Sequence, residues 1–140
     1  MTDRGFRLTV LTEEKAVIEE TVQSIVAPGT EGYLGVLRNH AALITELQAG
    51  RLSVTGLDRD TPEIYAVSGG FLEVSRNNAT LLADSLEPVA EIDVSRAGKA
   101  AERARKRLQE RGPSVDVARA EAALQRALNR MRLARQHIPT

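Results

Sequence analysis

The alternation of apolar and polar residues changes once along the chain. From Phe6 to Ser85 the apolar residues come in short runs with a period of two, separated by Gly, Pro or Asn, which is typical of β-strands. No helical segment separates these runs, so a parallel α/β fold is disfavoured and an antiparallel β-sandwich or barrel is favoured. The predicted strands cover residues 6–11, 15–20, 22–27, 32–37, 42–48, 51–55, 63–68, 71–75 and 79–83.

Two of the connections between these strands have the composition of tight turns. Pro28-Gly29 fits a turn because proline presets φ and glycine accepts a positive φ. Asn77-Asn78 stands between two β-rich runs, and asparagine tolerates a left-handed backbone. Both pairs are therefore predicted as turns.

After Glu87-Pro88 the period changes to about 3.6 residues, which indicates helix. A first helix is predicted over residues 94–110 with Asp93 as its N-cap, and Gly112-Pro113 ends it. Ser114 is the predicted cap of a second helix, with Asp116 in its first turn, running to about residue 137. The fold class is therefore α+β: an N-terminal antiparallel β-sandwich or barrel, residues 1–88, followed by a C-terminal two-helix hairpin, residues 89–140.

Small side chains dominate the predicted contact between the two helices. Because alanine buries little apolar area, the hairpin is expected to be only marginally stable and able to dock, undock or unfold. The predicted stripe of the first helix consists of Ala97, Ala100, Ala101, Ala104 and Leu108. That of the second consists of Val117, Leu124, Met131 and Ile138, flanked by Ala120, Ala127, Leu128 and Ala134.

Charge divides the chain at the same place as periodicity. Nineteen basic and nineteen acidic side chains cancel overall. The first ninety residues hold 7 basic and 13 acidic side chains, whereas the last fifty hold 12 basic and 6 acidic. The two halves therefore either meet different partners or attract each other.

Composition removes several classes of function. The chain has no Cys and two His, so disulfides, thiolate chemistry and a histidine-built metal site are not expected. Ser68-Gly69-Gly70 lies between two strands and lacks the full nucleophile-elbow pattern, so no catalytic set is predicted. No apolar run has the roughly 20 residues that span a bilayer, and no signal-peptide stretch follows Met1. We therefore expect a chain that is not an enzyme and stays in its compartment of synthesis.

The basic helices leave two kinds of partner open. Arg119, Arg126 and Arg130 fall within about 40° of one another on a helical wheel and together suit a phosphate or a partner's carboxylates. Nucleic-acid binding would use such charge, but the last fifty residues contain no Phe, Tyr or Trp for stacking. An anionic protein surface is favoured, and a freestanding nucleic-acid-binding module remains the alternative.

One run has specific similarity to a known family. Residues 28–43, Pro-Gly-Thr-Glu-Gly-Tyr-Leu-Gly-Val-Leu-Arg-Asn-His-Ala-Ala-Leu, resemble the epsilon-subunit motif of F-type ATP synthases. Residues 47–50, 67–74, 78–83 and 122–130 are similar to the same family, in the same order. The resemblance therefore extends over nearly the whole chain.

The resemblance implies a non-catalytic subunit of the rotating central stalk. In that family the β domain binds the gamma subunit and the c-subunit ring, and the helices extend toward the alpha and beta subunits to inhibit ATP hydrolysis. It implies contact with the c ring or gamma through Glu31, Gly32, Gly35 and His40, with the glycines shaping the loop. Many relatives have an acidic residue where this chain has Tyr33. The implied location is peripheral, at the cytoplasmic face of a bacterial plasma membrane, in a complex that couples proton transport to ATP synthesis.

Some members of the family bind ATP in the folded hairpin through an I-D-x-x-R-A motif. This chain has Ile92, Asp93, Arg96 and Ala97 in that pattern. Glu87 upstream, and Arg126 and Arg130 in the second helix, match further positions. The resemblance thus implies no required cofactor but ATP as a regulatory ligand, while Asp93 as a plain N-cap is the competing interpretation.

Overall fold

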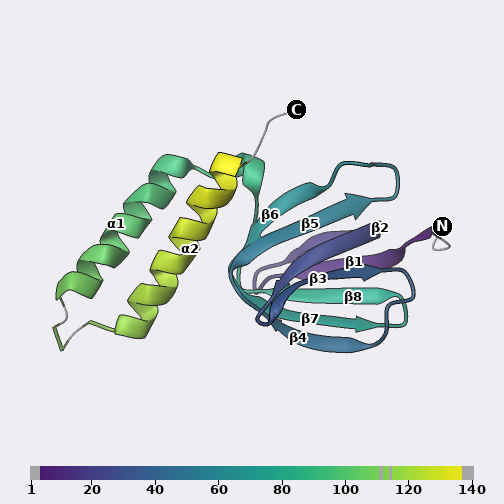
Figure 1. The fold of residues 1–140 in the computed structure, drawn as a ribbon, viewed down its shortest axis with the longest axis horizontal. Helices are drawn as coiled ribbons and strands as arrows, with labels where there is room; N and C mark the ends of the chain where they lie inside the picture. Colours follow the sequence, from purple (N-terminus) through teal and green to yellow (C-terminus); the bar gives the residue numbers. More distant parts are fainter. Residues whose placement is uncertain (1–3, 111, 114, 137–140) are drawn as a thin grey trace. The chain divides into compact units, whose positions relative to one another are not determined.

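The computed structural model describes residues 4–110, 112–113 and 115–136. Strands occupy the first part of the chain and helices the second, so the predicted α+β class is confirmed (Figure 1). The chain divides into two compact units, Met1–Pro88 and Val89–Thr140. The described elements are β1 (Phe6–Leu11), β2 (Ala16–Gly29), β3 (Gly32–Leu37), β4 (Leu43–Leu47), β5 (Gly50–Gly56), β6 (Glu63–Val67), β7 (Gly70–Ser75), β8 (Asn78–Ala83), β9 (Leu86–Pro88), the 3-10 helix η2 (Val89–Glu91), α1 (Val94–Glu110) and α2 (Val117–Gln136).

The long strand β2 joins the two layers of the sandwich. Its first half pairs with β1, and its second half pairs with β3 on one side and β5 on the other. The register against β5 shifts between Val22 and Ser24, which is where β2 passes from one layer to the other. The sequence predicts two separate strands over this range. That prediction is wrong. Glu20 and Thr21 are polar and interrupt the apolar pattern, but they pair with Leu8 and Arg7 and so continue the strand beside β1.

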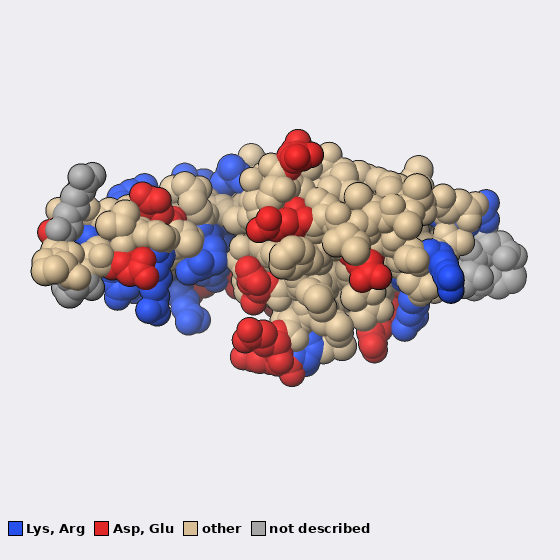
Figure 2. Space-filling model, turned by 90° about the horizontal axis from the view of Figure 1, so that it is seen from below, with Lys and Arg blue, Asp and Glu red and all other residues tan. Residues whose placement is uncertain are grey.

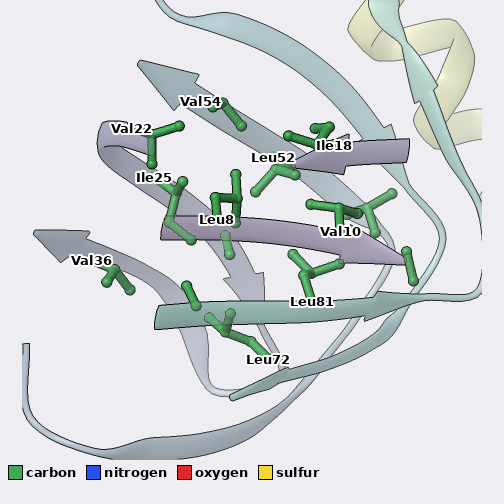
Figure 3. Close-up of a cluster of buried hydrophobic side chains, with 14 of the residues drawn as sticks. Leu8, Val10, Ile18, Val22, Ile25, Val36, Leu52, Val54, Leu72 and Leu81 are labelled. Carbon is green, nitrogen blue, oxygen red and sulfur yellow. The ribbon is translucent and has the colours of Figure 1, made fainter. Parts of the chain in front are cut away.

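The core of the β unit lies between the layers and consists of large aliphatic side chains. They come from strands distant in sequence, and the close-up shows Leu8, Leu52 and Leu81 converging from β1, β5 and β8 (Figure 3). All three are 0% exposed. Burial of such side chains contributes about 1.5–3 kcal/mol each. The inward-facing residues of the period-two pattern thus account for the stability of this unit.

The turns differ slightly from those predicted. Pro28 and Gly29 are the last residues of β2, and Thr30-Glu31 forms the turn before Gly32, whose φ is 132°. Between β7 and β8 the left-handed residues are Arg76 and Asn77, with φ of 50° and 58°, while Asn78 already belongs to β8. Two successive positive φ values match the type I′ geometry that suits the twist of a β-hairpin.

Aspartates begin both helices. The Arg96 backbone amide donates to Asp93 Oδ1 at 3.0 Å, so Asp93 is the N-cap of α1 as predicted. The Arg119 amide donates to Asp116 Oδ1 at 3.0 Å. Asp116 is therefore the cap of α2 and not a residue of its first turn. Ser114, the predicted cap, lies outside the described residues, as do His137 and Ile138.

The buried side chains of the helical unit are smaller than those of the β unit. Five of the seven buried residues of α1 and α2 are alanines. Val117, which the sequence places in the apolar stripe, is 45% exposed, and Leu124 and Met131 are half-buried. Neither helix of the described chain is long and apolar enough to cross a bilayer. The seven buried residues are Ala97, Ala101, Ala104, Ala120, Ala127, Asn129 and Leu133.

Candidate functional site

The tip of the β2–β3 hairpin presents the first predicted contact residues. Glu31 and Gly32 are both exposed there. The tip is held to β4 by two backbone hydrogen bonds, from the Thr30 amide to the Glu46 carbonyl at 3.1 Å and from the Gln48 amide to the Pro28 carbonyl at 2.9 Å. Glu31 therefore projects from a fixed loop and not from a free one.

Tyr33 adds a second attachment that sequence reasoning missed. The Arg51 backbone amide donates to the Tyr33 hydroxyl at 3.0 Å, and the Arg51 guanidinium carbon lies 5.8 Å from the centre of the Tyr33 ring. A cation at this distance from an aromatic ring is attracted to its face. Tyr33 thus fastens the start of β3 to the start of β5. The two residues are 18 positions apart, and nothing in their local sequence indicates the contact.

The structure does not bring His40 together with Glu31. β3 separates them, with Glu31 before its first residue and His40 beyond its last. His40 Nδ1 donates to the Ala41 carbonyl at 2.7 Å. Its neighbour Asn39 belongs to a clamp: the Asn39 amide donates to Asn77 Oδ1 at 2.6 Å, and Asn77 Nδ2 donates to Asn39 Oδ1 at 3.1 Å. Of the predicted contact residues, Glu31 and Gly32 therefore lie at one end of β3 and His40 lies beyond the other end.

Gly35 lies in a strand and not in a loop. It pairs with Val26 in β2 and is exposed. A Cβ added to Gly35 would have a single neighbour within 4 Å, the Ile25 carbonyl oxygen at 3.9 Å. The expectation that both motif glycines shape the loop holds for Gly32, with its positive φ, and is wrong for Gly35.

The I-D-x-x-R-A residues occupy the start of α1, in two different roles. Ile92 and Ala97 are buried, at 9% and 0% exposure, and serve packing. Asp93 and Arg96 are exposed. Asp93 already accepts the Arg96 amide as N-cap, so one of its oxygens has a structural partner. Only the two polar residues of the motif are accessible to a ligand.

Arg126 and Arg130 lie on α2, which runs antiparallel to α1. A Cβ added to Gly98 would lie 4.0 Å from Met131 Cε, which sets the start of the second turn of α1 at the level of the second half of α2. Arg130 precedes Met131 and shares this level, and Arg126 lies about 6 Å further along the axis. Arg126 is exposed and Arg130 half-buried. Glu87 belongs to the other unit, in β9, where it pairs with Ala66.

Charge on the helical unit is mostly basic. Figure 2 shows Lys and Arg gathered over the helical part of this face, and Asp and Glu spread over the β part. In the helical part that the structure describes, an ion pair joins Arg105 Nη1 to Glu102 Oε1 at 3.3 Å. Arg96, Arg119 and Arg126 have no carboxylate of the described residues within 4 Å, which leaves their guanidinium groups available to an anionic partner.

Two domain models of one known family match the two units of the chain. Residues 5–89 match the model of the ATP synthase delta/epsilon chain β-sandwich domain, and residues 90–135 match that of its long α-helix domain. The ATP synthase epsilon chain of Moorella thermoacetica is 50% identical over 130 residues, 93% of this chain and 96% of that one. That of Desulforamulus reducens is 44% identical over 128 residues, 91% and 96% of the two chains. The chain belongs to the ATP synthase epsilon family.

Solved structures agree with this membership. A chain in the Euglena gracilis mitochondrial ATP synthase, OSCP/F1/c-ring in rotational state 1, superposes with a TM-score of 0.79 at 27% identity, covering 96% of this chain and 82% of that one. A chain from the Tetrahymena thermophila central stalk and c-ring has the same fold, with a TM-score of 0.61 at 17% identity, covering 97% and 98%. The predicted role is thereby confirmed: a non-catalytic, central-stalk subunit of ATP synthase. None of these findings supports the nucleic-acid alternative.

Proposed function

We propose that the two units of this epsilon-family chain divide the work of the subunit. The β unit holds the chain on the rotor by binding the gamma subunit and the c-subunit ring. The tip residues Glu31 and Gly32 contact one of these partners, and the region of His40, at the other end of β3, contacts the other. The complex lies at the cytoplasmic face of a bacterial plasma membrane, with this chain as a peripheral part.

The helical unit is the regulatory part. Its interior of alanines supports the proposal, because a hairpin that buries few large side chains opens at little cost in free energy. Its exposed arginines suit acidic surfaces of the alpha and beta subunits. An opened hairpin that extends between those subunits inhibits ATP hydrolysis.

ATP stabilises the closed hairpin in this scheme. Arg96 and Arg126 contribute guanidinium groups to the triphosphate, joined by Arg130 at the level of the α1 N-terminus. Asp93 keeps its place as N-cap and contacts the adenosine portion with its remaining acceptor capacity. A ligand that binds only the closed form raises the stability of that form in proportion to ln(1 + [L]/Kd).

Deletion of residues 89–140 tests the regulatory role. The experiment reconstitutes the catalytic complex with the full chain or with residues 1–88 and measures ATP hydrolysis and subunit content. Hydrolysis is expected to rise with the shortened chain while the complex still assembles. Equal hydrolysis with both chains, at every ATP and ADP concentration, contradicts the inhibitory role.

Calorimetry tests the nucleotide site separately. Charge-assisted hydrogen bonds contribute about 1.5–3 kcal/mol, so Arg126→Ala is expected to weaken ATP binding by about tenfold or more. Arg107→Ala, an exposed arginine in the last turn of α1 at the opposite end of the hairpin, is the matched control and leaves binding unchanged. If millimolar ATP produces neither heat nor a rise in the melting temperature, the Ile92–Ala97 motif is a helix start alone.

A further inference from the structure

β3 is an edge strand whose outward backbone groups can be identified. It pairs with β2 on one side, and none of the described residues pairs with its other side. Gly29 pairs with Gly32 of β3 and with Leu47 of β4, so β3 and β4 lie on opposite sides of β2. The Pro28 carbonyl accepts the Gln48 amide and thus points toward β4.

Because the Pro28 carbonyl points away from β3, Pro28 and Tyr33 form a non-hydrogen-bonded pair of the β2–β3 ladder. In an antiparallel ladder such pairs alternate with hydrogen-bonded ones. Tyr33, Gly35 and Leu37 therefore direct their backbone groups away from β2, toward the outer edge. The Leu37 carbonyl accepts the His40 amide at 3.2 Å, and the other backbone groups of these three residues face outward without a partner among the described residues.

This edge lacks the features by which soluble proteins protect an edge strand. β3 is six residues long, contains neither a charged residue nor proline, and its register with β2 has no bulge. Its Tyr33 and Leu37 side chains are 49% and 63% exposed. β9, at an end of the strand order, is protected: it has three residues, carries Glu87 and ends in Pro88. An unprotected apolar edge on a subunit of a larger complex indicates that a partner covers it.

Gly35 adds an independent observation. Neither a positive φ nor a close neighbour within this chain requires glycine there. Glycine in a strand loses side-chain packing, and it commonly marks a place where another backbone approaches closely. The space above Gly35, between the exposed side chains of Tyr33 and Leu37, accommodates a large apolar side chain of a neighbouring strand, as aromatic residues cover glycines across a sheet.

We infer that β3 is completed by an extended strand from another subunit of the ATP synthase, which places a large apolar or aromatic residue opposite Gly35. This inference rests on the proposed attachment of the β unit to the rotor and specifies its chemistry. Only an extended backbone supplies donors and acceptors at the spacing of Tyr33, Gly35 and Leu37. Main-chain hydrogen bonds along the β3 edge thus provide most of the contact.

Hydrogen exchange measured on the full chain, free and assembled in the complex, tests the inference directly. The amides of Tyr33, Gly35 and Leu37 are expected to exchange rapidly in the free chain and to slow by about 100-fold or more in the complex. Those of Asp58 and Asp60, in the exposed β5–β6 connection, serve as the internal control. Unchanged exchange at Gly35 in a fully assembled complex overturns the inference and leaves the proposed attachment standing.

Two variants at one position separate the backbone from the side chain. Gly35→Pro removes an outward amide that donates to nothing within the described chain, and is expected to weaken assembly by about tenfold. Gly35→Ala keeps that amide, adds one methyl group, and is expected to change assembly by less than about threefold. Leu37→Lys, which places a charge on the edge, serves where Gly35→Pro fails to fold and is expected to weaken assembly by about tenfold.

The remaining outcomes also decide the matter. Assembly as in the wild type with both Gly35→Pro and Leu37→Lys overturns the inference. Protection of Gly35 in the free chain that grows with concentration, together with a dimer in sedimentation, identifies a second copy as the occupant and overturns it as well. Failure of the wild-type chain to assemble at all removes the proposed function and the inference together.

Discussion

The two units of this chain are built from side chains of very different size. The β unit buries Phe, Leu, Ile and Val from eight strands in one cluster, whereas the helical unit buries mostly alanine. Because the hydrophobic contribution grows with the apolar area removed from water, the first unit resists opening and the second does not. The comparison suggests how one short chain can be both an anchor and a switch.

A substitution in the β core has the largest expected effect. Leu81→Ala removes a side chain that is 0% exposed and is expected to lower the free energy of unfolding of the β unit by about 2–5 kcal/mol. Its neighbour Leu82, on the same strand but 51% exposed, is the matched control: Leu82→Ala is expected to cost less than about 0.5 kcal/mol. Urea unfolding followed by circular dichroism measures both. Equal losses refute the assignment of the core.

Overfilling the helical interior has a smaller effect, confined to that unit. Ala101 is 1% exposed, so Ala101→Leu forces the helices apart at a cost of about 1–3 kcal/mol. Ala122→Leu places the same side chain on an exposed position of α2 and is expected to be nearly neutral. Amide exchange should accelerate in α1 and α2 with the first variant and stay unchanged in β1 and β8. A hairpin that keeps its full stability in the Ala101→Leu variant would mean that the alanines do not set the helix separation.

Loss of a helix cap has the smallest effect, and it separates two roles of one residue. Asp93→Ala is expected to cost the helical unit about 1 kcal/mol, whereas Asp93→Asn retains the cap and costs less. Thermal melts without nucleotide measure this cost. Melts with ATP then show whether Asp93→Asn, with its cap intact, loses response to the nucleotide. Identical stability of the two variants without ATP rules out the capping role.

Periodicity was enough to predict most of the fold, since β1, β3 and α1 begin and end where the pattern does. It failed where local sequence and tertiary pairing disagree. β2 continues through polar Glu20 and Thr21 because β1 pairs with them, and β9 escaped prediction because three residues ending in Pro88 form a strand only beside β6. Short-range patterns contain no information on such partners.

The candidate sites could be predicted only where their residues are contiguous in the sequence. The residues of the hairpin tip and of the start of α1 lie in contiguous motifs, which a sequence displays directly. The Tyr33–Arg51 contact and the Asn39–Asn77 clamp join residues 18 and 38 positions apart, and no local pattern marks them. Whether Arg126 and Arg130 can reach a ligand at the start of α1 depends on how the antiparallel helices α1 and α2 are aligned along their axes. Only the fold shows this alignment.

Native-state hydrogen exchange across a denaturant series tests the central claim, that the helical unit opens at a lower free energy than the β unit. The amides of Ala101 and Ala127, in the hairpin, and of Leu8 and Leu81, in the sandwich, are compared on the intact chain. The four amides are expected to fall into two groups. The helical amides exchange through an opening reaction with a lower free energy and a smaller denaturant dependence than that of the sandwich amides. A single shared free energy of opening for all four amides would contradict it.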